Sequence, residues 1–352
     1  MLKIKENNLN DNAKYQDYLY KNPKLQYLFF ELTDKCNLQC LHCGSRCLRN
    51  NYNYLNKELV YKTLDNIKPN NDLMIIFTGG EPLLHRDLFE ILEYTNNKGF
   101  KIGMTTNGTL ITNEIAKKLL ETIGSITISL DGSETIHDNF RQTKGCFNLA
   151  IKGINNLQNN GLNVQVLTVV NKMNINELDN IYNILVNNDV KYWRLNNIDL
   201  IGRAKESKLL LTNDELNKMY QFIRDKRFDN TVSMSIQHGC SHFMFDYENE
   251  LRDYYYTCLA GIRVASVKVN GDITACLDIE NAPIQGNINS DNFNDIWNKE
   301  FKIYRQNKAL TCETCNNCEY CNVCRGDSWH TWDFENNKPN FCAKNIINII
   351  RG

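Results

Sequence analysis

The stretch TDKCNLQCLHC, residues 33–43, directly follows the apolar run Tyr27–Leu32. Aromatic and aliphatic residues dominate that run, which is typical of a β-strand. The loop after it places cysteines at positions 36, 40 and 43, in the spacing C-x3-C-x2-C. The sequence therefore predicts three thiols on one short loop at the carboxyl end of the first strand.

Further runs of strand character recur along the chain, separated by segments of helical periodicity. Leu88, Ile91 and Leu92 fall on one face of such a helix, and Thr212 with Glu215 forms a capping-box pattern that opens a later one. The predicted strands are Tyr27–Leu32, Leu73–Phe77, Lys101–Thr105, Ile126–Leu130, Val164–Val170 and Tyr192–Leu195.

Strands that alternate with helices predict a parallel sheet built from βα units. Six strands precede residue 200, whereas the common closed barrel has eight. We therefore expect an α/β fold with a partial (βα)6 TIM-type barrel over residues 25–230, after an N-terminal extension at residues 1–24. In such folds the chemistry lies at the carboxyl ends of the strands, which is where the cysteine loop falls.

The character of the sequence changes near residue 230, where helical periodicity fades and cysteines become frequent. Asn270-Gly271 separates two short runs of strand character and predicts a tight β-hairpin. A helix is expected over Phe293–Tyr304, followed by a loop-rich run. Residues 231–352 therefore predict a second, small cysteine-rich α+β domain.

The composition limits the kinds of protein that this chain can be. Of its 352 residues 42% are hydrophobic and 23% charged, as in a globular protein. Lys plus Arg number 40 against 41 for Asp plus Glu, so no basic excess indicates nucleic acid. No stretch approaches the roughly 18 apolar residues of a membrane span, and the N-terminus has no signal-peptide core. We expect a cytoplasmic protein with neither nucleic acid nor membrane as a partner.

Fourteen cysteines in such a protein indicate metal binding or chemistry rather than disulfides. Three thiolates on one loop can hold three irons of a [4Fe–4S] cube, whereas protein-held cubes usually take four cysteines. The fourth iron would then be open to a cofactor or substrate. From the loop alone, a zinc site completed by His42 and Cys47 stays open as the alternative.

The cysteine loop resembles the hallmark of radical S-adenosylmethionine (AdoMet) enzymes, in which the open iron chelates the methionine amine and carboxylate. The resemblance continues in order over residues 25–205. Glu81 lies in a stretch similar to the family's GGE motif, which binds the methionine amine, and Ser129 and Arg141 match positions that hold the carboxylate. The cofactor-binding residues that the resemblance implies are Gly79, Gly80, Glu81, Pro82, Asn107, Ser129, Asp131, Arg141, Thr168, Val169 and Arg203. Asn107 and Asp131 also fit turn and capping roles.

The later cysteines resemble the SPASM domain, which typically holds two auxiliary [4Fe–4S] clusters. Cys258, Gly271 and Cys276 form C-x12-G-x4-C. The second cluster would be held by Cys315, Cys318, Cys324 and Cys342. The metal ligands implied by both resemblances are Cys36, Cys40, Cys43, Cys258, Cys276, Cys315, Cys318, Cys324 and Cys342.

The first auxiliary cluster is the incomplete one, because the next cysteine of the pattern falls at Ser328. It could keep an open iron or recruit Cys312, Cys321 or Cys240. A shifted ligand register through Cys312 and Cys321 also stays open, as does a zinc ribbon built on the same C-x2-C steps. We prefer the unshifted register, because Cys324-Arg325-Gly326 resembles the family's usual C-[KR]-G.

SPASM proteins mostly modify peptides or proteins, so the resemblance implies a maturase that forms thioether or carbon–carbon crosslinks in a ribosomally made peptide. A flavodoxin- or ferredoxin-type electron donor is expected. Because about 24 residues precede the barrel, leader recognition is expected to need a separate protein or another surface of this one.

Three alternatives stay open. They are a sulfatase-maturing enzyme, an enzyme acting on a tetrapyrrole or other small molecule, and a non-catalytic metal-binding scaffold. In sulfatase-maturing enzymes a catalytic aspartate directly follows the equivalent of Cys276, whereas here Leu277 intervenes before Asp278. By its position in the sequence Asp278 is the first candidate for a catalytic residue, and Asp327 and Tyr320 are further candidates.

Overall fold

The computed structural model describes residues 9–229, 231–239 and 242–344. Its main feature is one ten-stranded sheet in the order β10-β9-β8-β1-β2-β3-β4-β5-β6-β7. The strands are β1 Tyr27–Glu31, β2 Met74–Thr78, β3 Lys101–Thr106, β4 Ser125–Ser129, β5 Val164–Val170, β6 Tyr192–Asn197, β7 Ser235–His238, β8 Val264–Val267, β9 Asp272–Thr274 and β10 Gly286–Asn287, with β11 Trp332–Asp333 and β12 Lys338–Pro339 as a separate pair.

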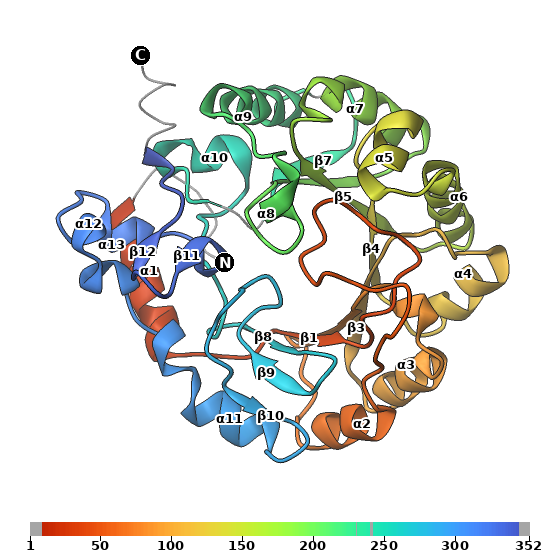
Figure 1. Cartoon of the computed structure of the whole chain (residues 1–352), viewed down its shortest axis with the longest axis horizontal. Coiled ribbons are helices and arrows are strands. Elements are labelled where there is room, and N and C mark those ends of the chain that lie inside the picture. The colour runs from red at the N-terminus through yellow and green to blue at the C-terminus, as the bar shows by residue number, and fades with distance from the viewer. Residues whose placement is uncertain (1–8, 230, 240–241, 345–352) are drawn as a thin grey trace.

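Helices connect the parallel strands and cover the outer side of the curved sheet (Figure 1). The α-helices are α1 Leu9–Lys21, α2 Lys57–Asp65, α3 Leu88–Asn97, α4 Asn113–Leu120, α5 Glu134–Arg141, α6 Cys146–Asn159, α7 Leu178–Asn187, α8 Ala204–Ser207, α9 Asn213–Arg227, α10 Glu248–Leu251, α11 Phe293–Lys299, α12 Glu313–Asn316 and α13 Cys321–Cys324. The 3-10 helices are η1 Pro82–Leu84, η2 Ile175–Glu177, η3 Phe245–Tyr247, η4 Phe301–Tyr304, η5 Lys308–Thr311 and η6 Trp329–Thr331.

The six predicted strands are confirmed as β1 to β6, which pair in parallel and in chain order. The α/β expectation of an incomplete barrel followed by a cysteine-rich segment is therefore confirmed. The capping box at Thr212 forms as predicted, because the Thr212 hydroxyl accepts from the Glu215 N–H and the Glu215 carboxylate accepts in return. Antiparallel β8 and β9 meet at Gly271, whose φ of +90° explains the glycine of the predicted hairpin.

Two additions to the sheet lie beyond the six predicted strands. The four-residue β7 pairs in parallel with β6, and β8 pairs in parallel with β1 at the other edge of the barrel strands. The sheet thus continues past residue 230, so the division of the chain there stays a prediction. Helix periodicity was predicted over Phe293–Tyr304, where the structure has α11 and then the 3-10 turn η4.

The N-terminal helix α1 packs on the cysteine-rich segment rather than on the barrel (Figure 1). The Gln16 side-chain amide donates to the Val323 carbonyl at 2.8 Å, and the Arg325 guanidinium donates to the Asp17 carboxylate at 2.7 Å. The start and the end of the described chain are therefore held together. None of the described helices is long and apolar enough to cross a membrane.

Candidate functional site

The principal pocket opens at the carboxyl ends of the parallel strands and has a volume of about 290 Å³. One wall is the cysteine loop, and the ends of β2 to β6 form the floor. The opposite wall combines residues after β6 with residues of the C-terminal segment. Lining residues that carry polar or sulfur groups include Cys36, Cys40, Cys43, Asn107, Ser129, Arg141, Asn196, Asn197, Asp199, Arg203, Asp278 and His330.

The three cysteines of the loop are suited to hold a metal cluster. Each sulfur accepts from a nitrogen donor: Cys36 from the Leu38 N–H at 3.4 Å, Cys40 from the Arg141 guanidinium at 3.5 Å, and Cys43 from a backbone N–H at 3.4 Å. Such donors stabilise negatively charged sulfur. The set therefore fits three thiolate ligands of an iron–sulfur cluster that share one cavity.

Backbone contacts at two glycine sites hold this loop in place. The Gly80 N–H donates to the Thr33 carbonyl at 2.6 Å, and the Glu81 N–H donates to the Lys35 carbonyl at 2.8 Å. A Cβ on Gly80 would lie 2.1 Å from the Lys35 carbonyl oxygen, and a Cβ on Gly202 would lie 2.2 Å from the Cys43 carbonyl oxygen. Only glycine allows these approaches.

Arg203 binds the cysteine loop directly. Its Nε donates to the Cys40 carbonyl at 2.9 Å and its Nη1 to the Cys47 carbonyl at 3.1 Å. Its backbone N–H donates to the Cys43 carbonyl at 3.1 Å. The guanidinium that was predicted to contact the cofactor thus also fixes the loop that carries the thiols.

Glu81 lies beneath the pocket instead of on its surface. The fully buried carboxylate accepts from the Thr106 hydroxyl at 2.7 Å and from the Asn107 N–H at 2.8 Å. Burial raises the pKa of this carboxyl to about 7, although the backbone and hydroxyl donors act against the rise. Its predicted contact with the methionine amine stays a prediction.

A buried ion pair supports the floor of the pocket. Arg141 Nε donates to Asp131 Oδ2 at 2.7 Å, and Arg141 Nη2 lies 2.5 Å from the same oxygen. Asp131 also accepts from the Val169 N–H at 2.8 Å. Burial would raise the pKa of Asp131, but the charge of Arg141, the neighbouring imidazoles and the Val169 N–H together hold that pKa below its usual range. Asp131 therefore acts on the pocket through Arg141, which lines it.

The predicted cofactor-binding residues divide into two groups. Those that line the pocket are Gly79, Gly80, Asn107, Ser129, Arg141, Val169 and Arg203. Those that lie behind its surface are Glu81, Pro82, Asp131 and Thr168. Thr168 is fully buried and donates to the Leu130 carbonyl at 2.6 Å, so its contacts are with the fold. The roles of all of them toward AdoMet stay predictions.

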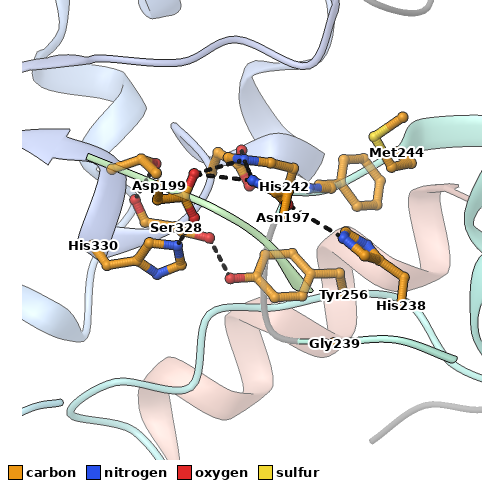
Figure 2. A network of polar contacts seen from close by, with 12 residues as sticks. Asn197, Asp199, His238, Gly239, His242, Met244, Tyr256, Ser328 and His330 are labelled. Atoms are coloured by element: carbon orange, nitrogen blue, oxygen red, sulfur yellow. Dashed lines mark hydrogen bonds and ion pairs between the residues drawn. The ribbon is translucent and has the colours of Figure 1, made fainter. Parts of the chain in front are cut away.

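The wall opposite the cysteines holds a polar network, of which the sequence analysis named only Asp327 (Figure 2). Asp199 contacts His330 at 3.0 Å through one carboxylate oxygen and His242 at 3.4 Å through the other. His242 contacts Asp327 at 2.7 Å through its second ring nitrogen. The Asn197 amide nitrogen lies 3.2 Å from Nε2 of the His242 ring. Asp199 and His330 face the pocket, and His242 and Asp327 lie behind them.

The electrostatics of this network follow from its alternation of carboxylates and imidazoles. Burial acts against ionisation, but hydrogen bonds from His242 and His330 hold the pKa of Asp199 far below its usual range. Burial lowers the pKa of His242, yet Asp327 and Asp199 raise it to about 9. At neutral pH His242 is therefore a buried cation between two carboxylates, and Asp199 stays ionised beside His330.

Asp278, the predicted catalytic residue, lines the same pocket. Burial raises the pKa of its carboxyl. A Cβ on Gly44, directly after the cysteine loop, would lie 3.7 Å from Asp278 Oδ1, so the two walls meet there. Tyr320 packs against the ring of Phe245 in the C-terminal segment and does not line the pocket.

The cysteines that were predicted to hold auxiliary clusters lie in the C-terminal segment. Cys258 and Cys324 line a second, very small cavity with Lys308 and Tyr256. Ser328, where the SPASM pattern has a cysteine, is fully buried and hydrogen-bonded to the Tyr256 hydroxyl at 2.5 Å.

Cys312 and Cys315 contact each other. Burial and then the Cys312 thiol raise the pKa of Cys315 to about 12, and the charge of Cys342 adds to it. Cys240 lies outside the described residues. The ligand register therefore stays a prediction.

In the part of the chain that the structure describes, no three His, Cys, Asp or Glu side chains are grouped for a metal ion. A four-iron cube takes its thiolates at separate iron atoms, so its ligand sulfurs surround a cube instead of meeting at one ion. The cysteine loop meets that requirement through its shared cavity and nitrogen donors.

Comparison with protein families matches two parts of the chain. The family model described as the Radical SAM superfamily covers residues 30–185, and the SPASM model, described as an iron–sulfur cluster-binding domain, covers residues 258–324. The first match contains the cysteine loop and the ends of β1 to β5. The second contains Cys258 to Cys324.

Curated relatives of two kinds resemble the chain. Fe-coproporphyrin III synthase of Methanosarcina barkeri is 32% identical over 59% of this chain, which spans about half of that relative (52%). AdoMet-dependent heme synthase of Oleidesulfovibrio alaskensis is 27% identical over 81% of this chain and 77% of its own. Mycofactocin maturase MftC of Mycobacterium tuberculosis is also 27% identical, over 79% of this chain and 71% of its own. Sequence identity therefore does not separate the relatives named for coproporphyrin or heme synthesis from the one named as a maturase.

Among solved structures, SuiB of Streptococcus suis bound to S-adenosylmethionine shares the fold with a TM-score of 0.76 and 18% identity. The match covers 95% of this chain and 81% of SuiB. The fold is thus shared along nearly the whole chain, the cysteine-rich segment included.

Proposed function

Because this chain is a radical SAM enzyme that carries a SPASM domain, we propose that it modifies a peptide or protein, such as a ribosomally made peptide. One side chain of that substrate would enter the pocket between the cysteine loop and the Asp199–His330 wall. Crosslinking to a neighbouring residue, through sulfur or carbon, is the reaction class that we favour.

The observation that carries this proposal is the charge of the wall opposite the cysteines. That wall presents Asp199 and Asp278 together with His330 and two asparagines. Arg203 is bound to carbonyls of the cysteine loop, and Arg141 is bound to Asp131 and is the residue predicted to orient the carboxylate of AdoMet, so neither is left to balance a carboxylate of the substrate. Because carboxylates repel anions, the wall favours a neutral or cationic side chain over a substrate with several carboxylates.

The size of the pocket supports the same substrate class. Ligand sites that enclose a whole drug-sized molecule run from roughly 300 to 1,000 Å³. A cavity of about 290 Å³ that must also receive AdoMet is too small to enclose a second whole molecule, so only part of the substrate would enter it. SuiB, which shares this fold, has been solved with a precursor peptide.

The chain's own residues would prepare the site for radical chemistry. A [4Fe–4S] cluster with AdoMet supplies a 5′-deoxyadenosyl radical, which removes a hydrogen atom from an unreactive C–H bond. Cys36, Cys40 and Cys43 would hold that cluster, and the nitrogen donors at their sulfurs stabilise the negative charge. Arg141 and Ser129 would orient the methionine carboxylate.

His330 has a place in the later part of the reaction. Oxidation of a substrate radical releases a proton with the electron, and one of the auxiliary clusters would accept the electron. With its Nε2 on ionised Asp199, the ring keeps Nδ1 to accept the proton. This arrangement follows the general logic of an imidazole oriented by a carboxylate. Asp278 is the second candidate for the same role.

A tetrapyrrole is the second candidate substrate, and the sequence comparison favours it. The M. barkeri relative acts on or forms iron-coproporphyrin III by its name, and the heme synthase matches most of both chains. The acidic pocket wall argues against a tetrapyrrole, since coproporphyrin carries several carboxylates that the wall would repel. A sulfatase-maturing activity is less favoured, because Asp278 is offset by one residue from the expected position.

A substrate assay distinguishes these candidates. Anaerobically reconstituted enzyme with AdoMet, and dithionite or reduced flavodoxin as the electron donor, is offered either the short peptides encoded beside its gene or iron-coproporphyrin III. We expect a peptide to raise 5′-deoxyadenosine formation and to lose two hydrogen atoms by mass spectrometry. Consumption of iron-coproporphyrin III, with every peptide unchanged, would overturn the proposal.

The roles of the wall residues are tested with matched variants. Asp199→Asn removes the charge beside His330, and Asp333→Asn changes an exposed carboxylate of the same segment that only caps its own turn. We expect the first to slow product formation and the second to leave it unchanged. A separate leader-binding protein is added where a peptide alone gives no product.

A further inference from the structure

Cys47 is a buried thiol that the radical chemistry does not use. It follows the three-cysteine motif by four residues and is 4% exposed. It packs in one buried cluster with Cys36, Cys40 and Cys43. The fifth cysteine of that cluster, Cys146, belongs to helix α6.

Three contacts fix Cys47 beside the loop. The Cys36 N–H donates to the Leu48 carbonyl at 2.9 Å, and the Leu48 N–H donates to the Asp34 carbonyl at 2.8 Å. The chain at residues 47–48 therefore runs alongside residues 34–36. The Arg203 guanidinium then donates to the Cys47 carbonyl at 3.1 Å. These bonds leave the Cys47 side chain little freedom to move away.

The contact that carries the inference is with Cys43. The Cys47 backbone N–H donates to Cys43 Sγ at 3.4 Å. The Cys47 thiol belongs to the buried cluster against which Cys43 packs. Among the three predicted ligands, Cys43 is therefore the one whose sulfur Cys47 contacts. Cys146, by contrast, donates to the Asp138 carboxylate at 3.3 Å.

We propose that Cys47 sets the reduction potential of the AdoMet-binding cluster by directing its backbone N–H and its thiol toward the sulfur of Cys43. Donors at a ligand sulfur draw negative charge from the cluster and favour its reduced form. Cys47 would then make the first electron transfer easier for a cellular donor. It acts through Cys43 and is a positioning residue, not a ligand. The inference needs the radical SAM cluster but no particular substrate.

Three variants test the inference. Cys47→Ala removes the thiol donor and keeps the backbone donor, Cys47→Ser keeps a hydroxyl donor, and Cys146→Ala is the matched control. Each reconstituted enzyme is titrated by potential under anaerobic conditions. The change that AdoMet makes in the electron paramagnetic resonance signal is followed, because that change reports the cluster with the open iron and not the auxiliary clusters.

We expect Cys47→Ala to keep its iron content and to shift the midpoint potential to a more negative value. Cys47→Ser should lie between that variant and the unaltered enzyme, and Cys146→Ala should not shift. An unchanged potential in Cys47→Ala would overturn the inference. So would an equal shift in Cys146→Ala, which would mean a packing effect, or a loss of iron in Cys47→Ala, which would make Cys47 a ligand. None of these readouts depends on the substrate, so failure of the peptide proposal is seen separately.

Discussion

Replacing Arg141 by methionine would leave the carboxylate of Asp131 ionised and buried without its partner. Asp131 is fully buried, and Arg141 binds it through Nε at 2.7 Å and through Nη2 at 2.5 Å. Removing one member of such a pair costs about 3–5 kcal/mol. We expect Arg141→Met to lower the free energy of unfolding by that amount. It also removes the donor to the Cys40 sulfur, so AdoMet cleavage should fall.

A double-mutant cycle isolates the pair. Asp131→Asn removes the charge but keeps an oxygen for the Val169 N–H. The variant that carries both changes should therefore be destabilised by about 1–3 kcal/mol less than the sum of the two single variants. The assay is anaerobic urea unfolding followed by tryptophan fluorescence. Lys299→Met, which breaks an exposed pair with Asp295, should cost less than about 1 kcal/mol. Additivity within about 0.5 kcal/mol would refute the reasoning.

Three further changes have expected outcomes. Replacing His330 by alanine should leave AdoMet cleavage intact and slow product formation, measured as the ratio of 5′-deoxyadenosine to product; an unchanged ratio would remove His330 from the reaction. Glu81 has a raised pKa of about 7, so its stabilising effect is present below pH 4.5 and is lost as the pH rises through 7. The free energy of unfolding of the unaltered protein, measured by urea titration, should therefore fall by about 3 kcal/mol relative to that of Glu81→Gln over that pH range. Parallel pH dependences of the two free energies would contradict this. Cys315→Ser should lower the iron content without abolishing AdoMet cleavage, and unchanged iron would exclude Cys315 as a ligand.

The strands and the pocket wall that carries the thiols could be predicted because their signals are local. The cysteine spacing of residues 36–43 and the apolar run Tyr27–Leu32 both lie in one short stretch. Gly80 also stands out as one of two glycines that follow a strand at once, where close backbone approach is common. These features need no knowledge of distant contacts.

The opposite wall could not be predicted, because it forms only when segments far apart in the chain meet. Asp199 and His330 are 131 residues apart, and His242 and Asp327 are 85 apart. A signal was present for Asp199, a polar residue just after a strand of the sheet. His330 lies in a short 3-10 turn with no periodicity, so nothing local marks it.

Strand β7 was missed for a related reason. It has four residues, which is too short for a periodic pattern, and pairing with β6 stabilises it. Strand β8 was predicted as one arm of the hairpin at Asn270-Gly271, but its parallel pairing with β1 was not, because that pairing joins segments far apart in the chain. The packing of α1 on the cysteine-rich segment depends likewise on contacts such as the one between Gln16 and Val323, which local propensity does not encode.

The central claim is that the loop of Cys36, Cys40 and Cys43 holds a cluster that cleaves AdoMet. The most direct test is to reconstitute the chain anaerobically with iron and sulfide, add AdoMet and dithionite, and measure 5′-deoxyadenosine. We predict that the unaltered chain forms it and that Cys36→Ala, Cys40→Ala and Cys43→Ala do not, whereas Cys146→Ala does. Normal 5′-deoxyadenosine formation by any of the three loop variants would contradict the account.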